Sequence, residues 1–210
     1  MSRFPVRLLL LLGLLLGAAG WSSAVSGGVV LVVGDSISAG YGVPPAKIWV
    51  NSLAAKVTAG GYPYTVVNAS ISGDTTAGGV SRLPALLRQH KPAVVVLELG
   101  GNDGLRALPM KATRNNLSQM VRLARKSGAR VLLLGMDIPP NLGQKYVQEF
   151  RSLYPQVAKA EGARLVPGFI ADVAVLPGMM QADGLHPNSL AQPKLADKVW
   201  GELEPLLKGQ

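Results

Sequence analysis

One serine of the chain, Ser36, lies in a turn whose residues could support nucleophilic chemistry. The turn Gly34-Asp35-Ser36 directly follows an apolar, β-branched run at residues 29–33. Such a run predicts a strand buried on both faces, so the serine would lie at the carboxyl end of that strand. A serine hydroxyl needs a general base to attack an acyl carbon, and the base that this chain offers is histidine.

The chain has two histidines, and their positions differ. His90 precedes the apolar run at 93–99, so we expect it in a surface loop at the amino end of that strand, away from Ser36. His186 has Asp183 three residues upstream, and this carboxylate could accept a hydrogen bond from the far ring nitrogen. An Asp-x-x-His pair before a helix is weak evidence alone, because capping aspartates look similar. The pair becomes a stronger candidate because two further turns are expected to meet Ser36 at the same place.

Two further turns should meet Ser36 at the same edge of a sheet. Residues 68–74 follow a second predicted strand, and residues 100–103 follow a third. Both turns are rich in glycine and small polar residues, which can present backbone N–H groups to a substrate. The sequence therefore predicts a site where three strands end.

Other chemistries fit the turns less well. The turn at Gly34 lacks the Gly-Lys-Ser/Thr ending of a P-loop, and no serine sits in a Gly-x-Ser-x-Gly elbow. Four aspartates could converge at the strand ends and bind Mg²⁺ or Ca²⁺: Asp35, Asp74, Asp103 and Asp183. None has Asp-x-Asp spacing, and aspartates in glycine turns commonly make local hydrogen bonds. We therefore expect no metal, although a metal-dependent hydrolase remains an alternative.

The elements that must position these residues alternate along the chain. Predicted strands cover residues 29–33, 64–67, 93–99, 130–135 and 165–166, and predicted helices cover 48–59, 80–89, 113–127, 146–161 and 189–207. Pro84 should fall in the first turns of its helix, and Pro155 should bend or restart its own. Strands separated by helices of this length predict an α/β fold with a parallel sheet covered on both faces.

The N-terminus has the pattern of a secretory signal. Arg3 and Arg7 precede an apolar stretch at 8–21, and Ser22-Ser23-Ala24 forms a small-residue cleavage site. We expect residues 1–24 to be removed and residues 25–210 to form a single domain, with a retained anchor as the alternative. The chain has no cysteine, which excludes disulfides and a lipid-modified cysteine. The predicted location is the periplasm or the exterior.

Positive charge is concentrated in one segment. The net charge is +9, and six basic residues occur between Lys111 and Arg130 without an acid. Apolar residues at helical spacing within the segment predict an amphipathic helix with a solvated basic face. Because no aromatic residue interleaves the basic ones, we expect no nucleic-acid partner. Weak contact between the helix at 113–127 and an anionic membrane surface stays open.

Four short blocks occur in a set order along residues 29–207: Gly34-Asp35-Ser36, Gly73, Gly101-Asn102-Asp103 and Asp183-x-x-His186. Together they resemble the signature blocks of the SGNH, or GDSL, hydrolases. Longer stretches at 67–75, 82–87 and 98–106 resemble the periplasmic thioesterase, lysophospholipase and arylesterase members of that family. The resemblance implies a three-layer α/β/α, flavodoxin-like fold with about five parallel strands, and a Ser-His-Asp mechanism without a cofactor.

The resemblance also implies a role for each matching residue. Ser36 would be the nucleophile, His186 the base and then the acid, and Asp183 the residue that orients the histidine. The oxyanion hole would consist of the Ser36 N–H, the Gly73 N–H and the Asn102 side-chain amide. The expected substrate-binding residues are Asp35, Asp74, Pro140 and Leu142.

Two departures from the family pattern concern packing and specificity. Ile37 stands where the family block has leucine, a conservative change. Leu142 stands where relatives have tyrosine, in the loop at 136–143 that lines the acyl site of relatives. The acyl-chain preference therefore stays open.

The resulting prediction is a monomeric serine esterase or thioesterase. Its expected substrates are small acyl esters, lysophospholipids or acyl-thioesters. A carbohydrate O-acetylesterase of the cell envelope is the alternative within the same fold. A non-catalytic binding module is the remaining one, and it has no need for a serine, glycine, asparagine and histidine set together.

Overall fold

The computed structural model describes Met1 and residues 27–209 of the chain. Apart from Met1, the predicted signal at 1–24 and its cleavage site lie outside the described residues.

Five parallel strands form one sheet, as the sequence predicts. They are β1 (Gly28–Gly34), β2 (Tyr64–Asn68), β3 (Val94–Glu98), β4 (Arg130–Leu134) and β5 (Arg164–Val166). Their spatial order is β2-β1-β3-β4-β5, the order of flavodoxin-like folds. In such a sheet the crevice for a ligand opens where the strand order reverses, beyond the carboxyl ends of β1 and β3.

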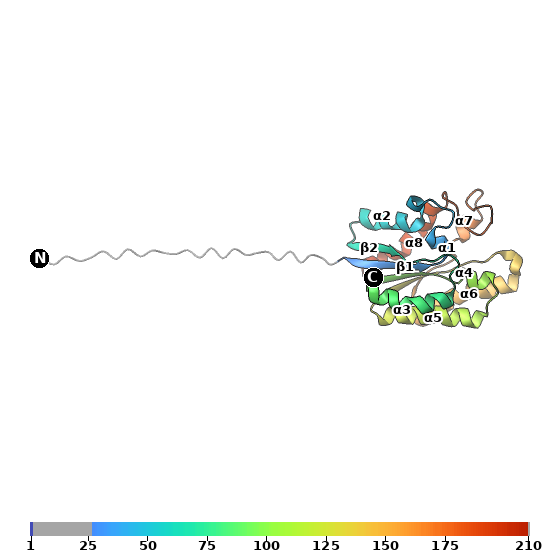
Figure 1. Ribbon diagram of the computed structural model, residues 1–210, viewed down its shortest axis with the longest axis horizontal. Helices are drawn as coiled ribbons and strands as arrows, with labels where there is room; N and C mark the ends of the chain where they lie inside the picture. Colours follow the sequence, from blue (N-terminus) through green and yellow to red (C-terminus); the bar gives the residue numbers. More distant parts are fainter. Residues whose placement is uncertain (2–26, 210) are drawn as a thin grey trace.

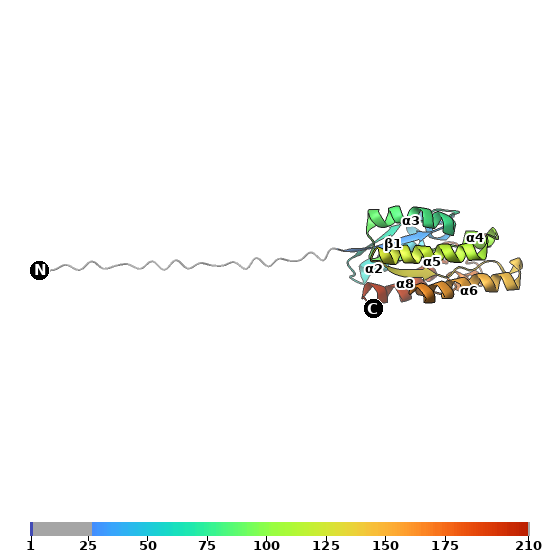
Figure 2. The same ribbon diagram turned by 90° about the horizontal axis from the view of Figure 1, so that it is seen from below.

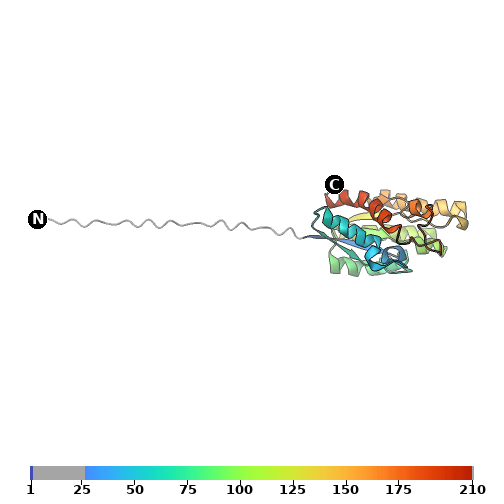
Figure 3. The same cartoon turned by 90° about the horizontal axis from the view of Figure 1, so that it is seen from above.

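Helices cover both faces of the sheet, which confirms the three-layer architecture (Figure 1). On one face lie α3 (Thr76–His90), α5 (Met110–Lys126) and α6 (Gln144–Glu161), seen in Figure 2. On the other lie α2 (Trp49–Ala59) and α8 (Gln192–Leu207), drawn cyan and red in Figure 3. The residues Val94–Leu97 of β3 are fully buried between these layers. Burial on both faces explains why this strand is a continuous apolar run.

Several helix boundaries differ from the sequence predictions. The helix α3 begins at Thr76 and not at residue 80, because the Thr75 side chain accepts a hydrogen bond from Gly78 N and caps it. Pro84 therefore lies inside this helix and not in its first turns. The helix α8 begins at Gln192 and not at residue 189, because the Asn188 side chain accepts from Leu190 N and holds a turn there.

Two other helix predictions are closer to the structure. The helix α6 runs unbroken from Gln144 through Pro155 to Glu161, so the predicted restart at Pro155 does not occur. The basic segment forms α5, whose predicted apolar side is fully buried at Leu117, Met120, Val121 and Ala124. His90 lies at the amino end of β3, as expected, but it is the last residue of α3 and not part of a loop.

Short helical turns gather at the carboxyl ends of the strands. They are α1 (Ser36–Ala39), α4 (Gly101–Leu105), α7 (Ala171–Ala174) and the 3₁₀ turns η1 (Pro45–Lys47) and η2 (Pro140–Leu142). None has enough residues for a periodic apolar pattern, so the sequence gives no sign of them. Within residues 27–209, no helix is both long and apolar enough to cross a membrane.

Candidate active site

Ser36 is the first residue of α1, directly after β1. The Asp35 side chain caps this turn by accepting a hydrogen bond from Ile37 N at 3.1 Å. Gly34 allows the turn to pack tightly, because a Cβ there would lie 2.5 Å from Glu98 Oε2 and 2.7 Å from Ser38 Oγ. The serine thus projects from a short, capped turn at the point where the strand order reverses.

His186 and Asp183 lie next to Ser36, although His186 is 150 residues away from Ser36 along the chain. His186 Nε2 is 2.8 Å from Ser36 Oγ, and His186 Nδ1 is 2.7 Å from Asp183 Oδ2. Asp183 Oδ1 accepts further hydrogen bonds from the backbone N–H groups of Leu185 and His186. The three side chains form a continuous hydrogen-bonded relay.

The pKa of Asp183 reflects these contacts. Partial burial raises it, but the hydrogen bonds from the His186 side chain and from the His186 and Leu185 N–H groups outweigh that effect and lower the pKa to about 2. The carboxylate is therefore ionised at any pH near neutrality. An ionised partner on Nδ1 leaves Nε2 free to accept a proton from the serine.

Tyr41 is a neighbour of the histidine that the sequence does not reveal. Its ring lies 4.7 Å from the His186 ring, measured between centroids, with the planes tilted by 43°. The Gln181 side chain donates to the carbonyl oxygens of Tyr41 and Pro187 and so ties the two loops together. The loop after β1 and the loop before α8 thus support the imidazole jointly.

The backbone N–H groups of Ser36 and Gly73 have no acceptor among the described residues. Gly73 lies in a turn closed by a hydrogen bond from Asp74 N to the Ile71 carbonyl, and its φ of 79° favours glycine. Two unpaired donors at the mouth of a sheet can stabilise an oxygen that gains negative charge.

The Asn102 amide, expected as a third donor, is already engaged. Its Nδ2 donates to Asp35 Oδ2 at 3.1 Å and to the Asp74 carbonyl at 2.9 Å. Each of its two hydrogens therefore has an acceptor inside the protein. Asn102 connects the ends of β1 and β3 with the loop after β2.

Two carboxyl groups are buried behind the nucleophile. Asp35 and Glu98 are 2 % and 0 % exposed. Burial raises the pKa of Asp35 to about 6, and burial followed by the nearby Asp35 charge raises the pKa of Glu98 well above its usual value. Glu98 is visible in the sequence as an acid interrupting an apolar run, but its role depends on its three-dimensional partners.

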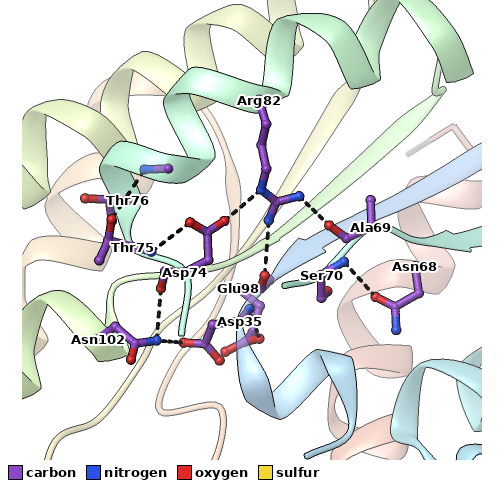
Figure 4. Close-up of polar contacts among 12 residues, drawn as sticks. Asp35, Asn68, Ala69, Ser70, Asp74, Thr75, Thr76, Arg82, Glu98 and Asn102 are labelled. Atoms are coloured by element: carbon purple, nitrogen blue, oxygen red, sulfur yellow. Dashed lines mark hydrogen bonds and ion pairs between the residues drawn. The ribbon is translucent and has the colours of Figure 1, made fainter. Parts of the chain in front are cut away.

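Arg82 of α3 joins the loops that carry the site (Figure 4). Its Nε donates to Asp74 Oδ2 at 2.7 Å, and its terminal nitrogens donate to the carbonyl oxygens of Ala69 and Gly34. A planar guanidinium can serve three acceptors in this way, which an ammonium group cannot do with fixed geometry. Arg82 thereby couples the turn before Ser36 to the loop that contains Gly73.

Asp35 and Asp74, which the sequence analysis expects to bind substrate, make contacts within the protein. Asp35 is buried and caps α1, and Asp74 forms an ion pair with Arg82. Both carboxyls are used to hold the loops in place. Pro140 and Leu142 lie exposed in η2, where a substrate can reach them, and Leu142 is 40 % exposed.

The four aspartates considered for a metal have other partners. Asp103 accepts hydrogen bonds from Thr76 N and Thr76 Oγ1. Asp35, Asp74 and Asp183 contact Ile37 N, Arg82 and His186, respectively. Across the part of the chain that the structure describes, no group of three or more His, Asp or Glu side chains is arranged to hold a metal ion.

Comparison with known proteins gives several relatives. Residues 32–192 match the family described as the GDSL-like Lipase/Acylhydrolase family. The chain is 53 % identical over 178 residues to the esterase TesA of Pseudomonas aeruginosa, covering 85 % of this chain and 89 % of the relative. It is 42 % identical over 184 residues to the thioesterase 1/protease 1/lysophospholipase of Escherichia coli, covering 88 % and 87 %.

Solved structures are similar as well. A crystal structure of TesA matches with a TM-score of 0.83 and 53 % identity, covering 85 % of this chain and 99 % of that one. A structure of the psychrotrophic esterase EstA from Pseudoalteromonas sp., inhibited by monoethylphosphonate, matches with a TM-score of 0.81 and 38 % identity, covering 86 % and 99 %.

Proposed function

Because the chain belongs to the GDSL-like lipase/acylhydrolase family and is an ester-hydrolysing enzyme, we propose that it acts through Ser36 as a covalent nucleophile. The observation that carries this proposal is the distance of 2.8 Å between Ser36 Oγ and His186 Nε2. That distance lies within the range needed for proton transfer between a nucleophile and its base.

In the first half of the reaction, Ser36 Oγ attacks the acyl carbon while His186 Nε2 takes the hydroxyl proton. The ionised Asp183 stabilises the imidazolium that forms and keeps the ring oriented. His186 then gives the proton to the departing alkoxide or thiolate, and an acyl-serine remains. In the second half, water attacks the acyl-serine with His186 again as base, and the acid leaves as Ser36 regains its proton.

The negative oxygen of each tetrahedral intermediate needs donors already in place. The unpaired N–H groups of Ser36 and Gly73 serve this purpose in our proposal, since both are free to donate. Asn102 is the third donor, and it reaches the oxygen when its amide gives up one of its two present acceptors. Each fixed donor in such a site is typically worth about 10² to 10³ in rate.

The nucleophile is tested with the purified Ser36→Ala variant and a short-chain p-nitrophenyl ester. We expect the rate to fall by about 10³-fold or more. Ser52→Ala, in α2, serves as the matched control and should keep wild-type activity. A phosphonate ester should label wild type and the control covalently and leave Ser36→Ala unlabelled. Undiminished hydrolysis by Ser36→Ala would overturn the proposal.

The proposed substrates are acyl esters and acyl-thioesters, with lysophospholipids among them. Names of the relatives, which include esterase, arylesterase and lysophospholipase, support this class. The exposed Leu142 in η2 is the residue most suited to contact an acyl chain from the loop after β4. A series from acetyl to dodecanoyl esters and thioesters, run on wild type and on Leu142→Tyr, measures the preference. A preference for acetylated glycans over every acyl ester would replace this substrate class.

We also propose that residues 1–24 direct export and are removed. The basic start, the apolar stretch and the Ser-Ser-Ala ending support this step. Mass determination of the mature protein from a secreting host gives the new N-terminus. An intact Met1 on the exported protein would contradict the assignment.

A further inference from the structure

The large apolar side chains that are exposed gather at one end of the molecule. Apart from Met1, all of those that the structure describes lie in loops or short turns at the carboxyl ends of the strands. Tyr41 and Ile71 follow β1 and β2 and are 56 % and 54 % exposed. Leu105 and Leu108 follow β3, at 40 % and 37 %.

The ring continues on the other side of the candidate site. Leu142 follows β4, and Val175 and Leu176 follow α7 beyond β5, with Val175 80 % exposed. Leu190, which is 69 % exposed, lies between His186 and α8. This set of eight side chains, which we call the apolar rim, surrounds the end of the sheet that carries Ser36. Figure 1 shows this end of the fold with α1, α4 and α7.

Unpaired positive charge accompanies the apolar rim. Six exposed basic residues lie in the same loops or in the first turns of the helices that begin there, and none is in an ion pair among the described residues: Lys47, Arg106, Lys111, Arg114, Lys145 and Lys194. The acids at this end are used differently. Asp74, Asp137 and Asp172 are in ion pairs with basic side chains, Asp183 is hydrogen-bonded to His186, and Asp35 and Asp103 are buried. Glu149, in the second turn of α6, is an exposed acid near this end.

The opposite end of α5 has basic residues as well, and most of these have partners within the protein. There Arg122 pairs with Glu161, and Arg125 donates to the Glu161 carbonyl. Arg130 donates to the Leu206 carbonyl. These basic residues are thus partly engaged within the protein, whereas Lys126 beside them is exposed and outside any ion pair among the described residues. The basic segment therefore has free positive charge at Lys126 as well as at Lys111 and Arg114, and the latter two lie beside the apolar rim.

We propose that the apolar rim docks the enzyme onto anionic lipid surfaces, with the mouth of the active site facing the lipid. Apolar side chains ringed by cations favour an interface whose headgroups are negative and whose acyl chains lie just beneath. In this orientation Ser36 receives acyl esters directly from the lipid. The inference rests on the proposed function. It assigns the membrane contact to the apolar rim, whereas the sequence analysis considered the basic face of the helix at 113–127.

A second copy of this chain is the other occupant that an apolar surface could take. The surplus of positive charge around the rim argues against it, because two such rims facing each other would bring like charges together. An anionic lipid surface has the complementary charge.

The test measures binding separately from catalysis. Ser36→Ala is mixed with vesicles of phosphatidylcholine, with or without about a third phosphatidylglycerol, and bound protein is quantified by sedimentation. We expect binding to the anionic vesicles, a fall in binding as NaCl is raised, and little binding to pure phosphatidylcholine.

Variants then locate the surface. Val175→Ser with Leu190→Ser should weaken binding to anionic vesicles by about tenfold or more, because two exposed apolar anchors are lost. Lys111→Gln with Arg114→Gln should weaken it as well. The matched charge control, Lys126→Gln with Lys159→Gln at the far ends of α5 and α6, should bind as the parent does. When the same substitutions are made in the enzyme that retains Ser36, all variants should hydrolyse a dissolved short-chain ester at the wild-type rate.

The outcomes separate the two proposals. If Ser36→Ala does not bind anionic vesicles, or if the far-end control weakens binding as much as the rim variants, docking through the apolar rim is wrong even when the enzyme hydrolyses dissolved esters. A dimer in solution that the two apolar substitutions dissociate would assign the rim to a second copy and would likewise overturn the inference. Loss of ester hydrolysis in Ser36→Ala is scored independently and concerns the proposed function alone.

Discussion

Glu98 and Asp35 meet directly behind the nucleophile: Glu98 Oε2 accepts a hydrogen bond from the Asp35 backbone N–H at 3.2 Å. The same oxygen accepts from Ser38 Oγ at 2.5 Å, so this one carboxyl group contacts the chain on both sides of Ser36. The strand register explains the meeting, because Glu98 is paired with Gly34 across β1 and β3. A buried acid at the end of β3 therefore holds the turn at the end of β1.

This contact predicts how stability depends on pH. Burial and the nearby Asp35 charge raise the pKa of Glu98, and burial raises that of Asp35 to about 6. The folded protein thus keeps protons that the unfolded chain releases above about pH 4, so stability should fall as pH rises from about 4 through 6 and beyond. Glu98→Gln keeps an acceptor for Asp35 N–H and cannot ionise, so it should flatten this fall.

Thermal unfolding of wild type and Glu98→Gln between pH 4 and pH 8 measures the effect. The exposed Glu149→Gln is the control and should leave the wild-type slope unchanged. Glu98→Leu should unfold at a lower temperature at every pH, because it leaves Asp35 N–H and Ser38 Oγ without their acceptor. Equal slopes for wild type and Glu98→Gln would contradict the prediction.

A methyl group at Gly34 should disturb the same turn. In Gly34→Ala the new Cβ would lie 2.5 Å from Glu98 Oε2, so the two strands must separate or the acid must move. We expect a loss of about 1–3 kcal/mol in the free energy of unfolding and a reduced kcat. Gly201→Ala in α8 meets no atom within 4 Å and should stabilise the protein by about 0.5–1 kcal/mol. Chemical denaturation measures both, and a neutral Gly34→Ala would argue against the tight packing.

Removing Arg82 should uncouple the loops that carry the site. Its side chain is 18 % exposed and donates to Asp74 Oδ2, to the Ala69 carbonyl and to the Gly34 carbonyl. We expect Arg82→Ala to cost about 2–3 kcal/mol of stability and to lower kcat more than it raises KM. Arg82→Lys should recover the charge but not the three-way geometry.

The matched comparison for Arg82 is an exposed pair of the same type. Arg122 is 59 % exposed and pairs with Glu161. Its replacement by alanine should lower the free energy of unfolding by no more than about 1 kcal/mol. Urea denaturation and ester kinetics on both variants separate the roles. Equal stability losses would mean that the Arg82 contacts add nothing beyond a surface ion pair.

Asp183→Asn should lower kcat by about 10² to 10⁴-fold with little change in KM, because an amide favours the wrong tautomer of His186. The pH dependence has a defined sign. A carboxyl whose pKa is lowered to about 2 contributes stability that is present above about pH 4 and is lost as pH falls toward 2. The variant should lack this part of the acid sensitivity. Thermal unfolding from pH 2 to pH 5 tests it, with the solvent-exposed Asp197→Asn as control.

The sequence by itself determined the fold and the positions of the main reactive groups. Apolar runs at β1 and β3 are continuous because both faces of these strands are buried, and the alternation with helices specifies a parallel sheet. From that, the positional rule for strand ends was enough to favour His186 over His90 as the partner of Ser36. The helix starts at Thr76 and Gln192 differ from the sequence predictions, because they depend on local side-chain hydrogen bonds and not on periodicity.

The tertiary structure alone decided the environment of that site. The contacts of Glu98 with Asp35, of Arg82 with Gly34 and of Tyr41 with His186 join residues 48 to 145 positions apart. Periodicity and turn composition report which face of an element is buried, but they carry no distance between such residues. Whether an aspartate caps a turn or meets a substrate, and whether exposed leucines form a ring, follows only when the loops are brought to the same end of the sheet.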